Sequence, residues 1–286
     1  MMHLPDIIHL LNIDHSTRNL ILARYASNPT KFDNAALNAY QSDAFDYPIC
    51  KHTPLDRLVI WCCLLPNVLS RYQQSNVPEH ICHDTIFEVT RLAKLYHAKT
   101  GRIGLSKDQV LWLRHVYHVH IFQIGSLQFQ TFRMVYLDRE ECEADYMKFS
   151  VEQKRRLPSG TQVVNVHIPD SADLSETAIE NSFSAADAFF REVFPTFQPK
   201  AYICYSWLLY PPMDALLPKG SHIRKFATKF QIISSVSDPY GSDAVKHIYG
   251  KRYARKADYP QNTSLQRNAL GNFSMLGMAC GIIEIA

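Results

Sequence analysis

The sequence lacks the features that mark several classes of protein. It has no run of about 18 apolar residues, so no transmembrane helix is expected. Its first residues, MMHLPDIIHLLNIDHS, have no basic stretch ahead of an apolar run and do not fit a secretory signal. Hydrophobic residues nevertheless make up 47% of the 286 residues, which is enough for a substantial core. These features favour a globular protein of the cytoplasm, with no membrane partner.

Charge and cysteine spacing exclude further classes. There are 30 Lys and Arg against 27 Asp and Glu, and this balance argues against a nucleic-acid partner. The 7 cysteines form no CxxC pair, and the adjacent Cys62 and Cys63 suit buried, reduced thiols. His115 and His118 would share a helix face, but His120 would not, and no carboxylate stands at a matching spacing. We therefore expect no metal site.

Residues 1–123 are predicted to form a helical domain. Thr53-Pro54 is a good helix start, and apolar residues then recur every three or four positions as far as Tyr72, with Pro66 expected to kink or divide the helix. A second helix is expected from about residue 78 to residue 100. Ser106 and Gln109 form a capping-box pattern ahead of a third, which would include VLWLRHVYHVHIF.

The pattern changes to alternating strands and helices in residues 124–286. Strands are expected at 127–137, 161–169, 201–209 and 224–236. Helices are expected at 175–194, 211–217 and 263–278, and the segment 138–156 is interpreted as a hairpin or an exposed loop. This order predicts a mixed β-sheet flanked by helices, so the whole chain is of the α+β or α/β class.

Several strings together resemble one known family. They are KTGRIGLS before Trp112-Leu113, then GSLQF, VNVHIP, ENSFSAADAFFREVFP, YICYSWLL, GSHIRKF and NTSLQR. In this order they are similar to acyltransferase-domain proteins that have a helical N-terminal domain and a GNAT-like C-terminal domain. The resemblance implies transfer of an acyl group from acyl-CoA, with acetyl-CoA as the first candidate, to an amine of a small molecule or peptide.

The sequence departs from this pattern at several places. The usual phosphate loop, Gln/Arg-x-x-Gly-x-Gly/Ala, is missing after His167. Related sequences commonly carry His where this chain has Tyr205, Asp where it has Tyr210, and Ser-Asn where it has Ser221-His222. The alternative to an enzyme is therefore a non-catalytic GNAT-like module that binds a ligand or a partner.

Four residues are candidates for catalysis. His167 closes a predicted strand, where ligands of α/β sheets tend to lie, and a neutral imidazole there could accept the proton of an amine. Ser206 or Tyr205 could protonate the departing thiolate. Cys204 could be an acyl-enzyme nucleophile, although direct transfer needs no cysteine. Each of the four also has an ordinary structural interpretation as a hydrogen-bonding or buried core residue.

Five further residues are candidates for binding the CoA moiety. Backbone amides near Ser175, at a helix start, could bind the pyrophosphate. Gln128 could line the pocket or point outward from its strand. Lys251 and Arg252 belong to the basic segment KHIYGKRYARK, which could receive phosphates or form a solvated loop. Arg267 lies near a predicted helix start, where a carboxylate partner or a bound anion would explain it. The aromatic content leaves room for a homodimer surface.

Overall fold

The structure, a computed structural model, describes residues 4–42, 47–143, 146–238 and 242–285. The chain divides into two units, Met1–Gln123 and Ile124–Ala286. They are called the helical unit and the sheet unit below, and each is described by itself. None of the described helices is long and apolar enough to cross a membrane.

The helical unit is built around one long, buried helix. Trp61, Leu65 and Val68 of α4 have no exposed surface, and burial of side chains of this size contributes about 1.5–3 kcal/mol each. The predicted start is confirmed, since the Thr53 side chain accepts a hydrogen bond from the Asp56 amide. The elements are α1 (Leu4–Leu10), α2 (His15–Ala26), α3 (Pro29–Gln41), η1 (Pro48–Lys51), α4 (Pro54–Gln74), α5 (Glu79–Ile86), α6 (Glu88–Thr100) and α7 (Lys107–Tyr117).

Helix α4 runs through Pro66 without being divided, and a kink at this residue stays a prediction. Two expectations for the helical unit need correction. The segment 78–100 forms two helices that meet at Phe87. Helix α7 begins with the predicted Ser106–Gln109 capping box but ends at Tyr117. Val119 then adopts a positive φ of 57°, which no helix continues through, and the β-branched residues after it start a strand.

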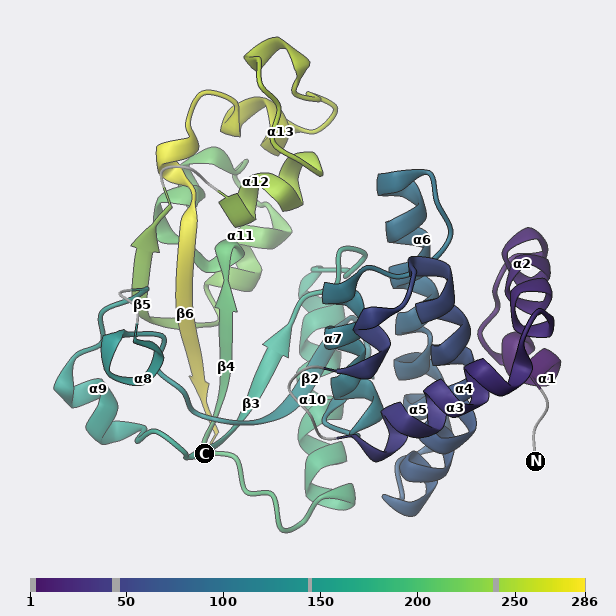
Figure 1. The fold of residues 1–286 in the computed structure, drawn as a ribbon. Helices are drawn as coiled ribbons and strands as arrows, with labels where there is room; N and C mark the ends of the chain where they lie inside the picture. Colours follow the sequence, from purple (N-terminus) through teal and green to yellow (C-terminus); the bar gives the residue numbers. More distant parts are fainter. Residues whose placement is uncertain (1–3, 43–46, 144–145, 239–241, 286) are drawn as a thin grey trace. The chain divides into compact units, whose positions relative to one another are not determined.

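The sheet unit contains the predicted mixed sheet with flanking helices (Figure 1). The strand order is β1-β2-β3-β4-β6-β5. Only the β3–β4 pair is parallel among the strand pairs whose register the structure gives. The strands are β1 (Ile121–Ile124), β2 (Leu127–Arg133), β3 (Gln162–His167), β4 (Ala201–Ser206), β5 (Gln231–Ser237) and β6 (Gly277–Glu284).

The helices of this unit differ from prediction in three segments. Residues 224–236 were expected as one strand, but helix α11 (His222–Ala227) precedes β5. The tail was expected as a helix over 263–278, but α13 (Ser264–Ala269) is short, and η5 (Phe273–Met275) and β6 follow it. The segment 138–156 contains two short helices, α8 (Arg139–Cys142) and α9 (Val151–Arg156). Strand β6 is largely buried between β4 and β5, so it lacks the apolar–polar alternation that reveals a strand.

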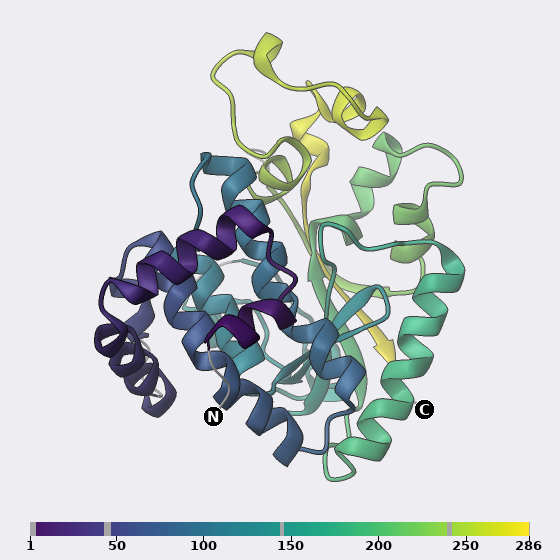
Figure 2. The same ribbon diagram turned by 90° about the vertical axis from the view of Figure 1, so that its right-hand side faces the viewer.

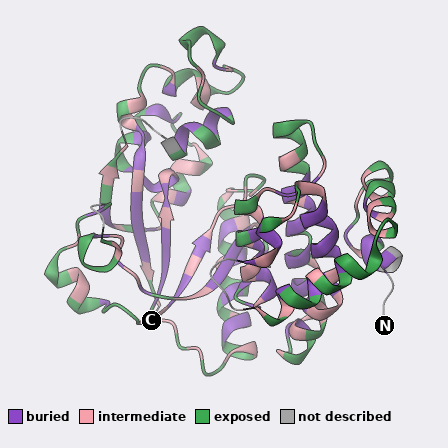
Figure 3. Ribbon diagram, in the orientation of Figure 1, coloured by how far each residue is buried: buried purple, intermediate pink, exposed green. Residues whose placement is uncertain are grey.

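Helix α10 (Glu176–Val193) covers one face of the sheet. Its Phe183 ring contacts the rings of Phe129 in β2 and Tyr202 in β4, with centroids 5.5 and 5.0 Å apart. Figure 2 shows α10, in green, running along one side of the sheet. The opposite face packs against a second apolar cluster that includes Tyr136, Met147 and Leu157. Burial on both faces explains why the strands are mostly buried in Figure 3.

A C-terminal group of small elements packs at one end of the sheet (Figure 1). It comprises η2 (Trp207–Leu209), η3 (Pro211–Leu216), α11, α12 (Ser242–Tyr249), η4 (Lys256–Asp258), α13 and η5. Its apolar cluster includes Val245 and Tyr249, and Trp207, Ile168 and Leu174 pack against it. Because Ile168 follows β3 and Trp207 follows β4, this group covers the C-terminal ends of the parallel strands.

Candidate functional site

Strands β3 and β4 separate toward their C-terminal ends. Their ladder joins Val164 to Tyr202 and Asn165 to Ile203, and beyond it the strands diverge toward His167 and Ser206 (Figure 1). Beyond the last pair, β3 and β4 no longer pair with each other. Helix α10 connects the two strands, so it runs back against them and begins at this same edge. The C-terminal edge of β3 and β4 is therefore the candidate functional site.

His167 is held by a hydrogen bond to the neighbouring strand. Its Nε2 lies 2.8 Å from Oε1 of Gln130, and the Asn165 amide also donates to that oxygen, at 3.4 Å. An imidazole that donates from Nε2 is, when neutral, basic at Nδ1. Gln130 is buried, which fixes the ring orientation. Sequence analysis did not select Gln130, although its alternation with Phe129 and Thr131 in β2 was visible.

Gln128 lies directly across the ladder from His167. The two residues are register partners in the antiparallel β2–β3 pair, so their side chains leave the same face of the sheet. This is the face opposite α10, because the intervening Phe129 contacts α10. Gln128 is only 4% exposed, so it does not point outward into solvent.

Tyr205 faces the same side as His167 but is engaged structurally. Its hydroxyl donates a 2.6 Å hydrogen bond to the carbonyl of Val135. Burial raises its pKa far above the usual range, and the adjacent Cys280 adds to the effect. The phenol is therefore protonated at neutral pH, and its proton is already directed at a carbonyl oxygen.

Cys204 and Ser206 project toward the other face, as strand alternation predicts. Cys204 is 1% exposed, and burial raises the pKa of its thiol well above the ordinary value. A thiol in this state is a poor nucleophile. The Ser206 hydroxyl oxygen accepts a 3.1 Å hydrogen bond from the amide of Leu208 and so caps η2.

Ser175 stands at the start of α10, but its side chain does not cap the helix. Its own amide donates to the carboxylate of Asp173 at 2.9 Å, and this bond lowers the pKa of Asp173. Glu176 occupies the first turn and accepts an ion pair from Lys225 at 3.2 Å. The helix start is thus flanked by two carboxylates, and the amides that follow Ser175 in the first turn are the donors that could meet an anion.

A group of three residues that the sequence did not reveal lies at the ends of β3 and β4. His247 of α12 stacks on the Trp207 ring, with centroids 6.0 Å apart and planes at 16°. Its Nδ1 lies 3.7 Å from a carboxylate oxygen of Asp170. The contact with the carboxylate of Asp170 raises the pKa of His247 above its ordinary 6.5, against the opposing effect of burial. Asp170 follows β3 and Trp207 follows β4, so His247 bridges the two diverging strands.

The basic candidates lie in the C-terminal group. Lys251 and Arg252 follow α12 and are exposed, and the Lys251 ammonium lies 5.0 Å from the centre of the Tyr253 ring. Because α13 is so short, Arg267 occupies its last turn, where a cation is favourable. Its guanidinium donates to the Gln261 carbonyl at 2.7 Å, and binding of an anion by this residue stays a prediction.

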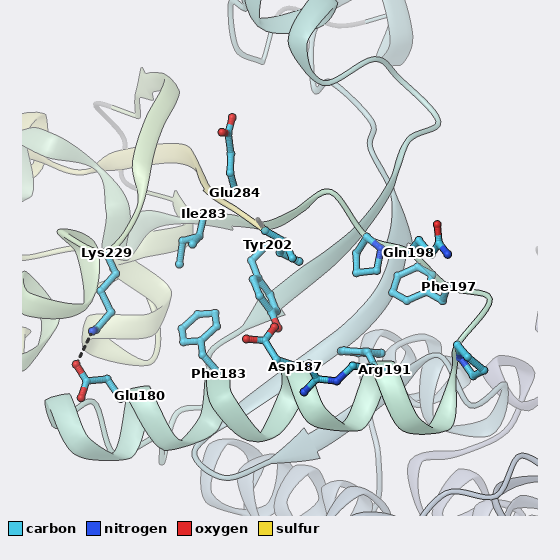
Figure 4. A pocket seen from close by; sticks show the side chains of 14 residues that line it. Glu180, Phe183, Asp187, Arg191, Phe197, Gln198, Tyr202, Lys229, Ile283 and Glu284 are labelled. Carbon is cyan, nitrogen blue, oxygen red and sulfur yellow. Dashed lines mark hydrogen bonds and ion pairs between the residues drawn. The ribbon is translucent and has the colours of Figure 1, made fainter.

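A cavity lies elsewhere in the sheet unit. It has a volume of about 920 Å³ and lies between α10, the start of β4 and the end of β6. Figure 4 shows Phe183, Asp187 and Arg191 of α10 along one wall, with Tyr202 and Ile283 across from them. Tyr202 is the second residue of β4, so this groove lies near the N-terminal end of that strand, away from the edge that carries Ser206 and Trp207. Neither this groove nor the strand edge contains a metal-binding group of His, Cys, Asp or Glu among the described residues.

The fold and the sequence together decide the family. The family model described as the GNAT-like C-terminal domain matches residues 121–282. The chain belongs to this family. The match covers the whole sheet apart from the last residues of β6, and it includes every candidate residue named above. No curated protein matches the sequence of this GNAT-like chain.

Solved structures similar to this GNAT-like protein are acyltransferases. One is an acyltransferase in complex with CoA and 10C-teicoplanin, with a TM-score of 0.76 at 17% identity. A second, in complex with decanoyl-CoA and teicoplanin, has a TM-score of 0.75 at 17% identity. A mutant acyltransferase with octanoyl-CoA has a TM-score of 0.75 at 16% identity. Each alignment covers 98% of this chain and 87% of the other. At such identities the similarity establishes the fold.

Proposed function

We propose that this protein is an acyltransferase that moves an acyl group from acyl-CoA to an amine acceptor. The observation that carries the proposal is the divergence of β3 and β4 beyond Asn165 and Ile203, next to the start of α10. An extended thioester arm could lie between the strands and use their backbone hydrogen-bonding groups. The acyl-CoA complexes of the similar acyltransferases support the same donor class.

In this proposal His167 is the general base. The Gln130 oxygen at 2.8 Å holds its Nε2–H, so Nδ1 would accept the proton of the attacking amine. The amine nitrogen forms a bond to the thioester carbon, and the carbon–sulfur bond then breaks with its electron pair going to sulfur. A positioned base of this kind contributes about 10²–10⁴-fold to the rate.

The contacts of the other candidate residues suggest a different role for each of them. Ser206 is the proposed proton donor to the departing thiolate, because its hydroxyl oxygen already accepts from Leu208 and its hydrogen can therefore be directed elsewhere. Solvent would then return a proton to Ser206 and take the amine's proton from His167. Tyr205 is proposed to support the strand through Val135. The buried thiol of Cys204 favours direct transfer to the amine over an acyl-enzyme.

Binding of the CoA phosphates is proposed at the start of α10. The amides of its first turn are the donors, in place of the missing glycine-rich loop. The neighbouring Asp173 and Glu176 are negative, so cations are needed to balance them. Lys225 already pairs with Glu176. The imidazolium of His247, beside Asp170, is a further candidate, and Lys251 and Arg252 follow the same helix. Gln128 is proposed to orient the reacting groups from the same face as His167.

Calorimetric titration with CoA and with acetyl-, octanoyl- and decanoyl-CoA tests the donor site. Micromolar binding corresponds to about 8 kcal/mol and is the expected result for at least one thioester. Transfer is then measured by thiol release with a panel of amines, from small molecules to peptides. Binding without release of CoA for any amine would instead identify a ligand-binding module. No binding to the folded protein would refute the proposal.

A further inference from the structure

The groove along α10 has features of a second ligand site, separate from the edge of β3 and β4. Its volume of about 920 Å³ lies within the range of small-molecule pockets. Aromatic and aliphatic side chains form most of its lining, and Figure 4 shows them facing one another across the space. The apolar lining comprises Phe183, Phe190, Pro195, Phe197, Pro199, Tyr202, Ile283 and Ile285.

The groove is elongated. Lys229 and Glu180 lie at one end, and Arg191, farther along the same helix, lies toward the other (Figure 4). Arg191 lies eleven positions after Glu180, which at 1.5 Å per residue corresponds to about 16 Å. An extended chain advances about 1.2 Å per bond, so this length accommodates about thirteen bonds. A linear aliphatic chain fits such a space better than a compact ring system does.

The charged side chains along the groove indicate which polar group a bound ligand would carry at its end. Lys229 is paired with Glu180 at 3.2 Å, and Glu284 with Arg156 at 2.7 Å. Asp187 accepts a 2.5 Å hydrogen bond from the hydroxyl of Tyr202. Burial raises the pKa of Tyr202, so this phenol remains a donor at neutral pH. Among the described residues, no carboxylate forms an ion pair with the lining guanidinium of Arg191.

We propose that this groove binds a medium-chain fatty acid. Its carboxylate would meet the guanidinium of Arg191, which suits bidentate recognition of a carboxylate. Its chain would lie over Tyr202, Ile283 and Phe183 toward Lys229. This site does not depend on the acyl-CoA site proposed above, because the anchoring Arg191 lies in the last turn of α10, at the opposite end of the helix from the proposed phosphate site.

Calorimetric titration with dodecanoate, below its micelle concentration, tests the site in the full chain. Saturating CoA is present throughout, so that the edge of β3 and β4 is not the place of binding. Dodecanol and dodecylammonium carry the same chain with a neutral or a positive end. We expect dodecanoate to bind at one site per chain, at least tenfold more tightly than dodecanol or dodecylammonium.

The variants Arg191→Gln and Lys229→Gln separate the proposed anchor from a cation that is already paired. Arg191→Gln is expected to weaken dodecanoate binding about tenfold and to leave dodecanol binding unchanged. Lys229→Gln is expected to change dodecanoate affinity less than twofold. Equal losses in both variants, or tighter binding of dodecylammonium than of dodecanoate, would each overturn the proposal. So would the absence of binding to the folded wild-type protein, whatever its transferase activity.

Discussion

The imidazole of His167 and the side-chain amide of Gln130 are joined across the β2–β3 ladder by a 2.8 Å contact. They are diagonal neighbours, because the residues directly opposite them are Gln128 and Asn165 respectively. The glutamine is buried and comes from a strand that is fixed on both sides. This contact gives the imidazole a defined orientation before any substrate arrives, which is what a general base requires.

Replacing His167 by Ala is expected to lower kcat by about 100-fold or more, because the amine loses its proton acceptor. The steady-state rate of thiol release, with the acyl-CoA and amine that react fastest, measures kcat. Gln130→Leu should give a smaller loss together with a shifted pH profile, since the base is present but its Nε2–H has lost its acceptor. His97→Asn, on the exposed side of α6, is the matched control. An unchanged rate in His167→Ala would exclude this residue as the base.

Replacing Cys204 by Ala is expected to leave kcat within about threefold of wild type, because the buried thiol stays protonated and does not attack the thioester. Mass spectrometry of the intact protein during turnover should show no added acyl group. An acyl adduct that is present in wild type and absent from Cys204→Ala would contradict the direct-transfer route. Unfolding in urea serves as the control for folding of the variant.

His247 is expected to titrate above its ordinary pKa of 6.5, chiefly because the carboxylate of Asp170 lies 3.7 Å from its Nδ1. Asp243 also raises its pKa, while burial and Lys246 lower it. A raised pKa means that the folded state binds the proton more tightly than the unfolded state does. The resulting stabilisation is complete below pH 6.5 and is lost as the pH rises through the raised value.

NMR titration of the His247 ring measures this pKa, and Asp170→Asn should lower it. The Asp170→Asn variant should be less stable than the wild type, and this difference in stability should be larger at pH 6 than at pH 9. If acyl-CoA phosphates use the imidazolium, CoA affinity should also fall over the same pH interval. A His247 pKa at or below 6.5 in wild type would show that the Asp170 contact does not form in solution.

Replacing Gly281 by Ala is expected to destabilise the sheet unit by about 1–3 kcal/mol through overpacking. A Cβ at this position of β6 would lie 2.7 Å from the Cβ of Phe230 and 2.8 Å from a methyl carbon of Leu209. Urea unfolding measures the change. Gly101→Ala is a useful comparison, because that glycine has a positive φ but no heavy atom within 4 Å of its added Cβ. Equal stability of Gly281→Ala and wild type would refute the close packing.

Local signals in the sequence predicted much of the backbone. The caps at Thr53 and Ser106 and the apolar stripe of α10 act over three or four residues, so a single segment reveals them. Strand β6 was missed for the opposite reason. Its GMACGIIE run carries two glycines and little alternation, and only pairing with both β4 and β5 makes it a strand.

The candidate site also combines features that the sequence predicts with features that only the tertiary structure shows. The sequence by itself determined that His167 ends a strand and that Cys204 and Ser206 share one side of another, because strand alternation has a period of two residues. Only the tertiary structure placed Gln130 beside His167, and only it brought Asp170, Trp207 and His247 together from three separate segments. Such contacts depend on strand register and on how β3 and β4 diverge, and both are set by packing between residues far apart in the chain.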